Sequence, residues 1–494
     1  MKIKNKKLYI FLTIYFFINL IFLTRFPFMH SDESWLSGLS RNIAENKSLA
    51  VTETFFNLAP RYPHAIKSIF HLGQVLFMYL FGYTLFTFRL ISLLFSLISI
   101  YLFNIITQKT IKNNSFMFTI IFALDIQFIY ASHFARQEII ILALFLLAFN
   151  LVLSNKIKSS ALILGLAIGV HPNAFIISLA IGFYLIYLLI IQKTNLSKIL
   201  QYIFILASFA LVFVLISFYL DPDFINHYLS FGSQFEVTSS FTKKLLEFKN
   251  FYLKLYYQVS ITYYNPYINV QLVIFTITFA LSLLNFKDNL DLILIIIAIN
   301  LAILIIGRFN PTSIVLMTPI FYLLLFRIYQ QFTFKKIFLI FCLVFNIVNS
   351  LVNIYPYLSH SYDNYLTNLQ SYLDPDSKVL ANLNLEYYFD NNQLIDYRNL
   401  YYLKENNLTL NQYLENEQIG YIIYSQEMDL IYNTRPIYND VYGNTYYYYQ
   451  DLQDFIKNNC SYIGEFEDNL YSIRIVSHQF QENYQVRVYK INNY

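Results

Sequence analysis

Charged side chains are scarce in this chain of 494 residues, of which only 13% are Asp, Glu, Lys or Arg. Soluble globular proteins carry about 25% charged residues, so the chain has roughly half of the usual share. Hydrophobic residues make up 57% of the chain, and the mean hydropathy is +0.45. This composition excludes a cytosolic enzyme, a disordered chain and a nucleic-acid-binding protein.

Glycine and cysteine are also few. With 11 glycines, the sequence offers no glycine-rich loop that could hold a phosphate. The two cysteines are Cys342, inside an apolar run, and Cys460, near the C-terminus. Two such residues cannot frame a disulfide scaffold or a zinc site.

Charge divides the chain into two regions. Residues 1–355 hold 26 Lys and Arg against 12 Asp and Glu, whereas residues 356–494 hold 8 against 18. We therefore predict a basic, apolar transmembrane domain over 1–355 and an acidic, polar tail domain over 356–494.

Long apolar runs fill the first region. A membrane-spanning helix needs about 20 apolar residues, fewer where protein surrounds it. No small-residue cleavage site follows the first run, so we expect an uncleaved span. The eleven predicted spans lie near 8–24, 85–106, 115–131, 138–154, 159–171, 173–191, 199–219, 268–285, 289–306, 312–328 and 337–355.

The loops between these runs alternate in charge. If the N-terminus is cytoplasmic, the cytoplasmic segments hold 14 of the 26 basic residues, starting with Lys2 and Lys4, against the acids Asp288 and Asp291. The positive-inside rule favours this arrangement, and an odd number of spans places the tail domain outside. We expect a multi-pass plasma-membrane protein with an extracytoplasmic tail domain. The apolar stretch 65–82 is expected to lie at the membrane interface.

The tail domain has the pattern of a small mixed α/β domain. The β-type runs are KVLANLN, YIIYS, YSIRIV and YQVRVYKI, and the helix-like stretches are LTLNQYLENEQ and DLQDFIKNN. No catalytic motif is found there, so the chemistry is expected in the loops of the first region.

Two adjacent acids, Asp32 and Glu33, follow the first span directly. Either Ser31 or Asp32 could cap a helix that starts at Glu33, which is the structural interpretation. The functional interpretation is a general base and its partner, because a hydroxyl group must lose its proton as it attacks.

Further polar residues fall in the predicted outer loops or inside a span. Arg136 and Glu138 in HFARQE could form a snorkelling pair at the membrane face. An acid inside a span is costly, so Asp125 is expected to face the bundle interior. His171 in GVHPNAF could mark only a helix boundary.

His64 in PRYPHAIKS has a simple structural interpretation too, as a hydrogen-bonding side chain. Arg308 in GRFNPTS could bind phosphate, since its charge is permanent, or anchor a helix at the interface. The string Asp221-Pro-Asp223 could bind a divalent metal. The same letters describe a capping Asp followed by Pro at the first helical position, which we favour.

The ordered set of segments resembles the polyprenyl-phosphate-sugar glycosyltransferases of the GT-C superfamily, such as the protein O-mannosyltransferases and the lipid A aminoarabinose transferase. The resemblance covers most of residues 1–355. The segments that carry it are DESWLSGLSRNIAE, PRYPHAIKS with LFGYTLFTFRLISLLFSL, ASHFARQEIIILALFLLAF, GLAIGVHPNAF and GRFNPTSIVLMTPIFYLLL.

This resemblance implies an α-helical polytopic fold and a transfer reaction on the outer face. Asp32 would be the catalytic base with Glu33 beside it, and Arg136 and Glu138 would line the same cavity. Arg308 would hold the lipid phosphate. His64 and His171 join this set of substrate-binding candidates.

The donor implied is a single sugar on a polyprenyl or dolichyl phosphate, transferred with inversion to a lipid, protein or glycan acceptor. No cofactor is expected, and a divalent metal at Asp221 and Asp223 stays an option. Two alternatives stay open. One is a glycan polymerase or ligase that uses a diphosphate-linked oligosaccharide, and the other is a flippase or transporter of a lipid-linked sugar.

Overall fold

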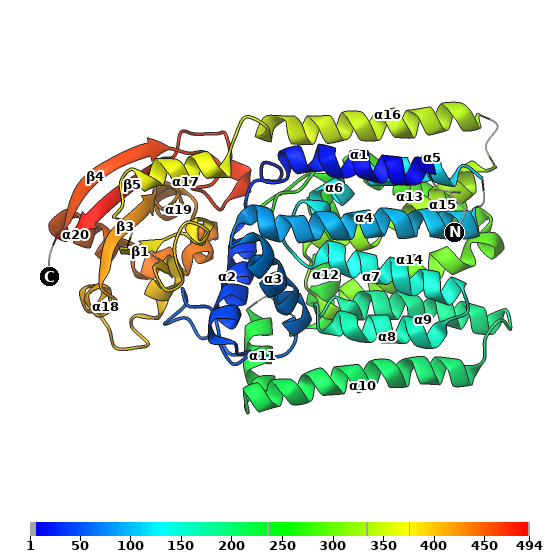
Figure 1. Cartoon of the computed structure of the whole chain (residues 1–494), viewed down its shortest axis with the longest axis horizontal. Coiled ribbons are helices and arrows are strands. Elements are labelled where there is room, and N and C mark those ends of the chain that lie inside the picture. The colour runs from blue at the N-terminus through cyan, green and yellow to red at the C-terminus, as the bar shows by residue number, and fades with distance from the viewer. Residues whose placement is uncertain (1–5, 112, 235–236, 332–333, 375, 493–494) are drawn as a thin grey trace.

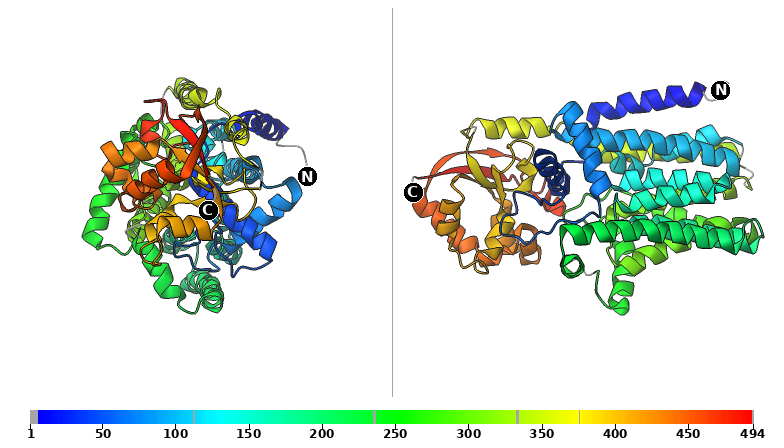
Figure 2. Two further views of the ribbon diagram at one scale, coloured as in Figure 1. Left: turned by 90° about the vertical axis from the view of Figure 1, so that its left-hand side faces the viewer. Right: turned by 60° about the horizontal axis from the view of Figure 1, so that its bottom comes forward.

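The computed structural model describes residues 6–111, 113–234, 237–331, 334–374 and 376–492. Lys2 and Lys4, which belong to the predicted basic N-terminus, lie outside the described residues. The helices of the body lie side by side in one elongated bundle, and the tail domain sits at one end of it (Figure 1). Helix α1 begins at the opposite end in Figure 1 and in the right-hand view of Figure 2.

All eleven apolar runs form helices. The bundle consists of α1 (Lys6–Phe22), α4 (Leu85–Thr110), α5 (Ser115–Ala123), α6 (Ile126–Ser132), α7 (Glu138–Leu153), α8 (Ile157–Ile168), α9 (Ala174–Ile190), α10 (Leu196–Leu220), α13 (Asn269–Leu284), α14 (Phe286–Ile306), α15 (Thr318–Tyr329) and α16 (Lys335–Ile354). Shorter helices at the tail-domain end or beside the bundle are α2 (Ser31–Asn46), α3 (Ser68–Phe81), α11 (Phe224–Ser233), α12 (Phe241–Tyr256) and the 3-10 helix η1 (Pro311–Leu316).

Among the residues that the structure describes, five helical segments are both long and apolar enough to cross a membrane by themselves. They are Leu85–Thr110, Leu196–Leu220, Phe286–Ile306, Pro311–Tyr329 and Lys335–Gln370. Helix α10 has a mean hydropathy of 2.7, yet only 11% of its apolar window is buried. An apolar helix that exposes most of its surface faces lipid, so the chain is a multi-pass membrane protein. The count of eleven spans stays a prediction.

One predicted span is broken. Helices α5 and α6 meet at an angle of 65° at Leu124 and Asp125. The Asp125 carboxylate caps α6 by accepting the backbone N–H of Gln127 at 2.9 Å, and its other oxygen accepts the Tyr322 hydroxyl at 2.8 Å. Asp125 is 1% exposed, so the prediction that it faces the interior is confirmed.

The tail domain holds a five-stranded mixed sheet in the order β2-β1-β3-β5-β4. Strands β1 (Lys378–Ala381), β2 (Leu394–Asp396) and β3 (Ile419–Ser425) are parallel, and β5 (Gln485–Ile491) is antiparallel to β3 and to β4 (Cys460–Glu467). The helices around the sheet are α17 (Tyr362–Gln370), α18 (Leu410–Asn416), α19 (Glu427–Thr434) and α20 (Tyr449–Asn459). The 3-10 turns are η2 (Tyr355–Tyr357), η3 (Leu383–Leu385), η4 (Tyr397–Tyr402), η5 (Pro436–Tyr442), η6 (Thr445–Tyr447) and η7 (Val476–His478).

One strand prediction is wrong. The run YSIRIV forms no strand, because side-chain carboxylates take the backbone donors that a sheet would need. The Asp468 carboxylate accepts the N–H groups of residues 470–472. The buried Glu427 carboxylate accepts the N–H groups of Arg474 and Ile475, the latter at 2.7 Å. The segment is thereby held as an irregular loop that points toward the body.

Helix α2 lies between the bundle and the tail domain (Figure 1) and contacts both. Buried Arg41 forms an ion pair with Glu386 and donates to the Phe389 carbonyl at 2.6 Å. Near the start of the helix, the Arg474 guanidinium donates to the Ser31 hydroxyl at 3.0 Å. Contacts with the tail domain near both ends of α2 therefore fix the position of this helix.

Gly38 allows this close packing, and its substitution provides a test. A Cβ at Gly38 would lie 2.5 Å from the buried Phe55 ring, whereas a Cβ at Gly73 in α3 would meet nothing within 4 Å. Gly→Ala inside a helix normally stabilises by about 1 kcal/mol. We expect Gly73→Ala to raise the apparent melting temperature in nanodiscs. Gly38→Ala should lower it, since overpacking costs about 1–3 kcal/mol. Equal rises for both would show that α2 is not tightly packed.

Candidate functional site

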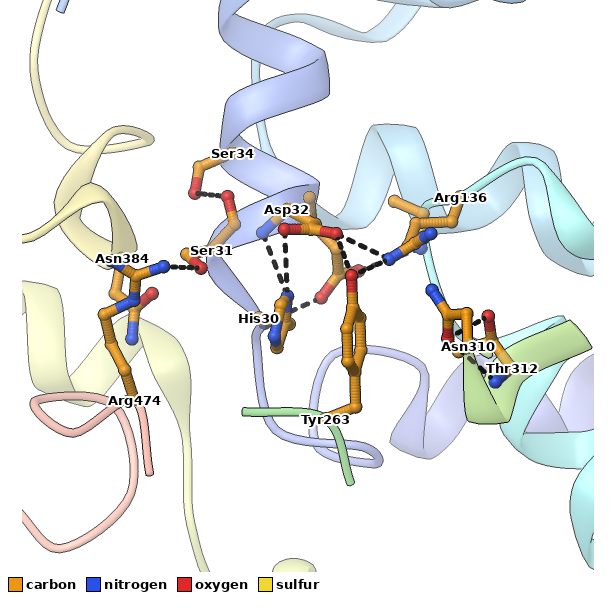
Figure 3. A network of polar contacts seen from close by, with 12 residues as sticks. His30, Ser31, Asp32, Ser34, Arg136, Tyr263, Asn310, Thr312, Asn384 and Arg474 are labelled. Carbon is orange, nitrogen blue, oxygen red and sulfur yellow. Dashed lines mark hydrogen bonds and ion pairs between the residues drawn. The ribbon is translucent and has the colours of Figure 1, made fainter. Parts of the chain in front are cut away.

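The first turn of α2 holds both acids of the predicted pair, and Figure 3 shows Asp32 beside Arg136 and Tyr263. The helix begins at Ser31, and its cap is His30, not Ser31 or Asp32 as the sequence indicated. The His30 Nδ1 accepts the N–H of Asp32 at 3.0 Å, while the Glu33 carboxylate accepts the N–H of His30 at 3.0 Å. This reciprocal capping fixes the direction of both acids. A histidine is an unusual cap, which is why sequence preferences missed it.

Glu33 points into the protein and is fully buried. The Arg89 guanidinium donates to its two oxygens at 2.8 and 2.7 Å, and the Ala135 N–H donates at 2.9 Å. With the His30 N–H, its carboxylate accepts four hydrogen bonds. Glu33 thus connects α2, α4 and the loop that carries Arg136, and it lies next to Asp32 in sequence while facing away from it.

Asp32 faces the opposite way, and 24% of its side chain is exposed. Its Oδ2 accepts the Arg136 guanidinium at 2.5 Å and the Tyr263 hydroxyl. Tyr263 stacks on the His30 ring with centroids 4.4 Å apart. Burial alone would raise the pKa of Asp32, but Arg136, His30, the Tyr263 hydrogen bond and Arg308 together hold it well below its usual range. Asp32 is therefore ionised at neutral pH.

Arg136 joins Asp32 to Glu138. Its second terminal nitrogen lies 3.0 Å from Glu138, whose Oε1 also accepts the Thr312 hydroxyl at 2.7 Å. Thr312 belongs to η1, which begins three residues after Arg308. The structure thus brings together Asp32, Arg136 and Glu138, in agreement with the sequence interpretation, and adds Tyr263 and Thr312.

Positive charge gathers beside these acids. Burial, then Arg308 and Arg136, lower the pKa of the Lys67 ammonium to about 8. Within the described ranges, this ammonium forms no hydrogen bond or ion pair with the protein. Arg308 is one of the charges that lower the pKa of Lys67, and it is also one of those that lower the pKa of Asp32. Such a pair of cations suits an anionic ligand.

The two candidate histidines are neutral at pH 7. Burial and Lys67 lower the pKa of His64 to about 4, and burial, Lys67 and Arg308 lower that of His171 further. His171 therefore lies in the field of the cations, between α8 and α9, and its Nδ1 accepts the N–H of Asn173 at 3.0 Å. The helix boundary that His171 predicted is confirmed.

Asp221 and Asp223 lie apart from the acid cluster. Asp221 accepts the N–H of Asp223 at 3.1 Å and the His227 ring at 2.7 Å. Helix α11 begins after Asp223, so Pro222 is not its first residue as predicted. Across the residues that the structure describes, no three His, Cys, Asp or Glu side chains gather as a metal site.

Several residues of the site were missed by sequence reasoning. Lys67 lies in the quoted segment PRYPHAIKS, where attention fell on His64. Tyr263 is one of 45 tyrosines, and only its contact with Asp32 distinguishes it. Arg398 and Arg474 come from the tail domain, and both lower the pKa of His30 after burial does so. The absence of a local motif explains each omission.

Solved structures provide the comparison. Over 98% of this chain and 98% of the other, the fold matches the crystal structure of ArnT from Cupriavidus metallidurans bound to undecaprenyl phosphate, with a TM-score of 0.59 and 11% identity. The chain has the fold of ArnT. The apo structure of ArnT matches over 77% of this chain and 83% of that one, with a TM-score of 0.51 and 12% identity. No family model and no curated protein sequence matches. At this level of identity the likeness shows the fold alone, and it agrees with the α-helical polytopic fold that the sequence resemblance implied.

The Glu33 contacts predict a stability defect. Glu33→Gln leaves the buried Arg89 without a counter-charge, which costs about 3–5 kcal/mol in buried pairs. We expect a clearly lower apparent melting temperature in nanodiscs, while Glu415→Gln on exposed α18 should change nothing. An unchanged melting temperature would show that the Glu33–Arg89 pair does not stabilise the fold.

Proposed function

We propose that the chain is an integral-membrane glycosyltransferase. It moves a single sugar from a polyprenyl-phosphate donor to an acceptor hydroxyl on the extracytoplasmic face of the plasma membrane, with inversion. One observation carries the proposal: Asp32 is held ionised and partly exposed beside two cations, Lys67 and Arg308. The ArnT fold supports it, because one matching structure holds undecaprenyl phosphate.

In the proposed reaction the acceptor oxygen attacks the anomeric carbon of the sugar. The hydroxyl proton passes to Asp32, and the bond between the anomeric carbon and the phosphate oxygen breaks with its electron pair leaving on the phosphate. Lys67 and Arg308 stabilise the second negative charge that develops on the released polyprenyl phosphate. The positive charge comes from side chains, so the expectation that no metal is required is kept.

The low pKa of Asp32 bears on this step. A carboxylate held this firmly by Arg136 is a weak base in the empty protein. A bound donor phosphate would offset the field of the surrounding cations and raise the pKa of Asp32. Donor binding would therefore prepare the base for acceptor attack.

An apolar pocket of about 420 Å³ offers a place for the lipid chain. Its wall includes Tyr256 of α12, Ile277 of α13 and Met317 beside η1. Tyr256 and Ile277 are exposed, so the pocket opens toward the lipid-facing surface. The η1 segment also carries Thr312, which contacts Glu138, and this places the pocket next to the site along the chain.

Asp32→Asn tests the proposed base. Radiolabelled polyprenyl-phosphate monosaccharides and a crude envelope acceptor would be added to protein in nanodiscs. We expect transfer to fall by at least about a hundredfold, the usual size of a general-base effect. Asp451→Asn on the exposed first turn of α20 is the matched control. Normal transfer by Asp32→Asn would place the base elsewhere, and movement of intact donor between leaflets without release of polyprenyl phosphate would favour a transporter.

Lys67 predicts a pH dependence of polyprenyl-phosphate binding. Its ammonium is charged below its pKa of about 8 and loses that charge as pH rises. A bound anion raises the pKa of Lys67, so the protein binds the anion less tightly once the free lysine begins to lose its proton. The affinity for polyprenyl phosphate should therefore start to fall near pH 8, well below the pH at which an ordinary lysine loses its charge. Lys67→Arg should remove this loss, and Lys67→Gln should weaken binding about tenfold or more at pH 7. Lys47→Gln, an exposed change, is the control. A flat affinity up to pH 10 in the unchanged protein would exclude Lys67 as the ligand.

A further inference from the structure

The tail domain brings a second positive group to the site through Arg398. This residue lies in the first turn of η4, whose cap Asp396 accepts the N–H of Arg398 at 2.9 Å. The next residue, Asn399, accepts the N–H groups of Leu58 and Ala59 at 3.0 and 3.1 Å. The backbone at Arg398 is thus fixed against the first outer loop of the body.

The Arg398 side chain lies on an aromatic surface. Its guanidinium carbon is 5.2 Å from the centroid of Trp35 in α2 and 5.7 Å from that of Phe56. Arg61 lies over the same indole at 4.6 Å, but Arg61 is neutralised by two hydrogen bonds to Glu53. In the part of the chain that the structure describes, the Arg398 guanidinium has no hydrogen bond or ion pair with the protein. The carboxylates of Asp396 and Asp32 act favourably on its charge, so what the guanidinium lacks is a hydrogen-bond partner and not a counter-charge.

Neighbouring groups act on this charge in both directions. Burial and then Arg474 lower the pKa of Arg398 to about 10, while Asp396 and Asp32 oppose that shift, so Arg398 remains charged at neutral pH. The Arg474 guanidinium donates to the Ser31 hydroxyl and the Val441 carbonyl, and the backbone N–H of Arg474 donates to the Glu427 carboxylate. His30 has its Nδ1 occupied by the Asp32 N–H, and its buried Nε2 meets no partner among the described residues.

Asp32 interacts electrostatically with both groups of cations. Arg308 is among the charges that act on Asp32, and Asp32 is among those that act on Arg398. Lys67 and Arg308 come from the body, whereas Arg398 and Arg474 come from the tail domain. A donor phosphate held by the first group leaves the Arg398 guanidinium without a hydrogen-bond partner in the described part of the protein. A guanidinium with open donors beside a second cation is suited to bind a carboxylate or a phosphate there.

We propose that Arg398 is a specificity-determining residue that binds an anionic group, a phosphate monoester or a carboxylate, on the acceptor beside the hydroxyl that Asp32 deprotonates. The acceptor class is then a negatively charged glycan or lipid headgroup. This inference rests on the proposed function for the identity of the acceptor, but the anion site itself can be tested without any transfer.

The chain provides its own reporter, because Trp35 is its single tryptophan and Arg398 lies on its ring. Protein in nanodiscs would be titrated with octyl glucoside 6-phosphate, with unphosphorylated octyl glucoside and with inorganic phosphate, and Trp35 fluorescence would be followed. We expect a saturable change with the phosphorylated glucoside and none with the neutral one. A response to inorganic phosphate alone would mean that no sugar or lipid group is recognised, and it would overturn the acceptor assignment.

Four variants separate this site from the donor phosphate site. Arg398→Gln should weaken binding of the phosphorylated ligand at least tenfold, Arg398→Lys should recover part of the affinity, and Lys404→Gln on the exposed tail surface should bind normally. Lys67→Gln should leave this titration unchanged and reduce polyprenyl-phosphate binding. The melting temperature of each variant shows whether the protein is folded. If Arg398→Gln destabilises the fold, partial recovery of ligand affinity in Arg398→Lys still tests the role of the positive charge.

Two results would overturn the inference. The first is a fluorescence response that is equal for charged and neutral glucosides. The second is loss of polyprenyl-phosphate binding in Arg398→Gln, which would assign Arg398 to the donor. Failure of sugar transfer with an intact, Arg398-dependent anion response would instead count against the proposed function alone.

Discussion

The buried pair of Glu33 and Arg89 is the contact on which the site depends. Glu33 accepts donors from α4, from the cap of α2 and from the N–H of Ala135. Asp32 directly precedes Glu33 in the chain, and Arg136 directly follows Ala135, whose N–H donates to Glu33. Glu33 therefore fixes the backbone next to both partners of the Asp32–Arg136 ion pair. Arg89 in turn donates to three backbone carbonyls between Leu23 and Phe28. A buried carboxylate thus aligns a second carboxylate that faces outward.

Most charged side chains of the site are balanced by an opposite charge nearby. Arg136 lies between the acids Asp32 and Glu138, and the nearby histidines are neutral because burial and the neighbouring cations lower their pKa values. The side chains of Lys67 and Arg398 form no hydrogen bond or ion pair within the described part of the protein. Cations of the body and of the tail domain thus both interact electrostatically with Asp32.

The body was largely predictable from its sequence, because long apolar runs have few alternatives to helices in a membrane. All eleven runs are helical, although the break at Asp125 was not foreseen. Short elements were harder. Strand β2 has three residues, and YSIRIV has a strand pattern that the carboxylates of Asp468 and Glu427 override. The Glu427 contacts join residues 47 and 48 positions apart, which local patterns do not report, whereas the Asp468 contacts span only two to four residues.

Local sequence patterns identified some residues of the candidate site and missed others, because only some of them stand out from their neighbours in the chain. Asp32, Arg136 and Glu138 stand out as polar residues at the ends of apolar runs, and the structure places them in contact. Lys67 sits among more conspicuous neighbours, and Tyr263 is hidden by the abundance of tyrosine. Arg398 lies in a domain without any recognisable motif. Its relevance depends on how the tail domain packs on α2, which is a property of the tertiary structure.

The contacts between the body and the tail domain determine which segments can be exchanged together in a chimaeric protein. Residues 30–59 make contacts in both directions: His30 and Glu33 toward the bundle, Asn57 and the Phe55 carbonyl toward the sheet domain. The covalent boundary near residue 355 is therefore not the physical boundary. A chimaera that exchanges only the tail would join two surfaces shaped for other partners. The transplantable unit is the tail together with residues 30–59, although some 300 residues separate them in sequence.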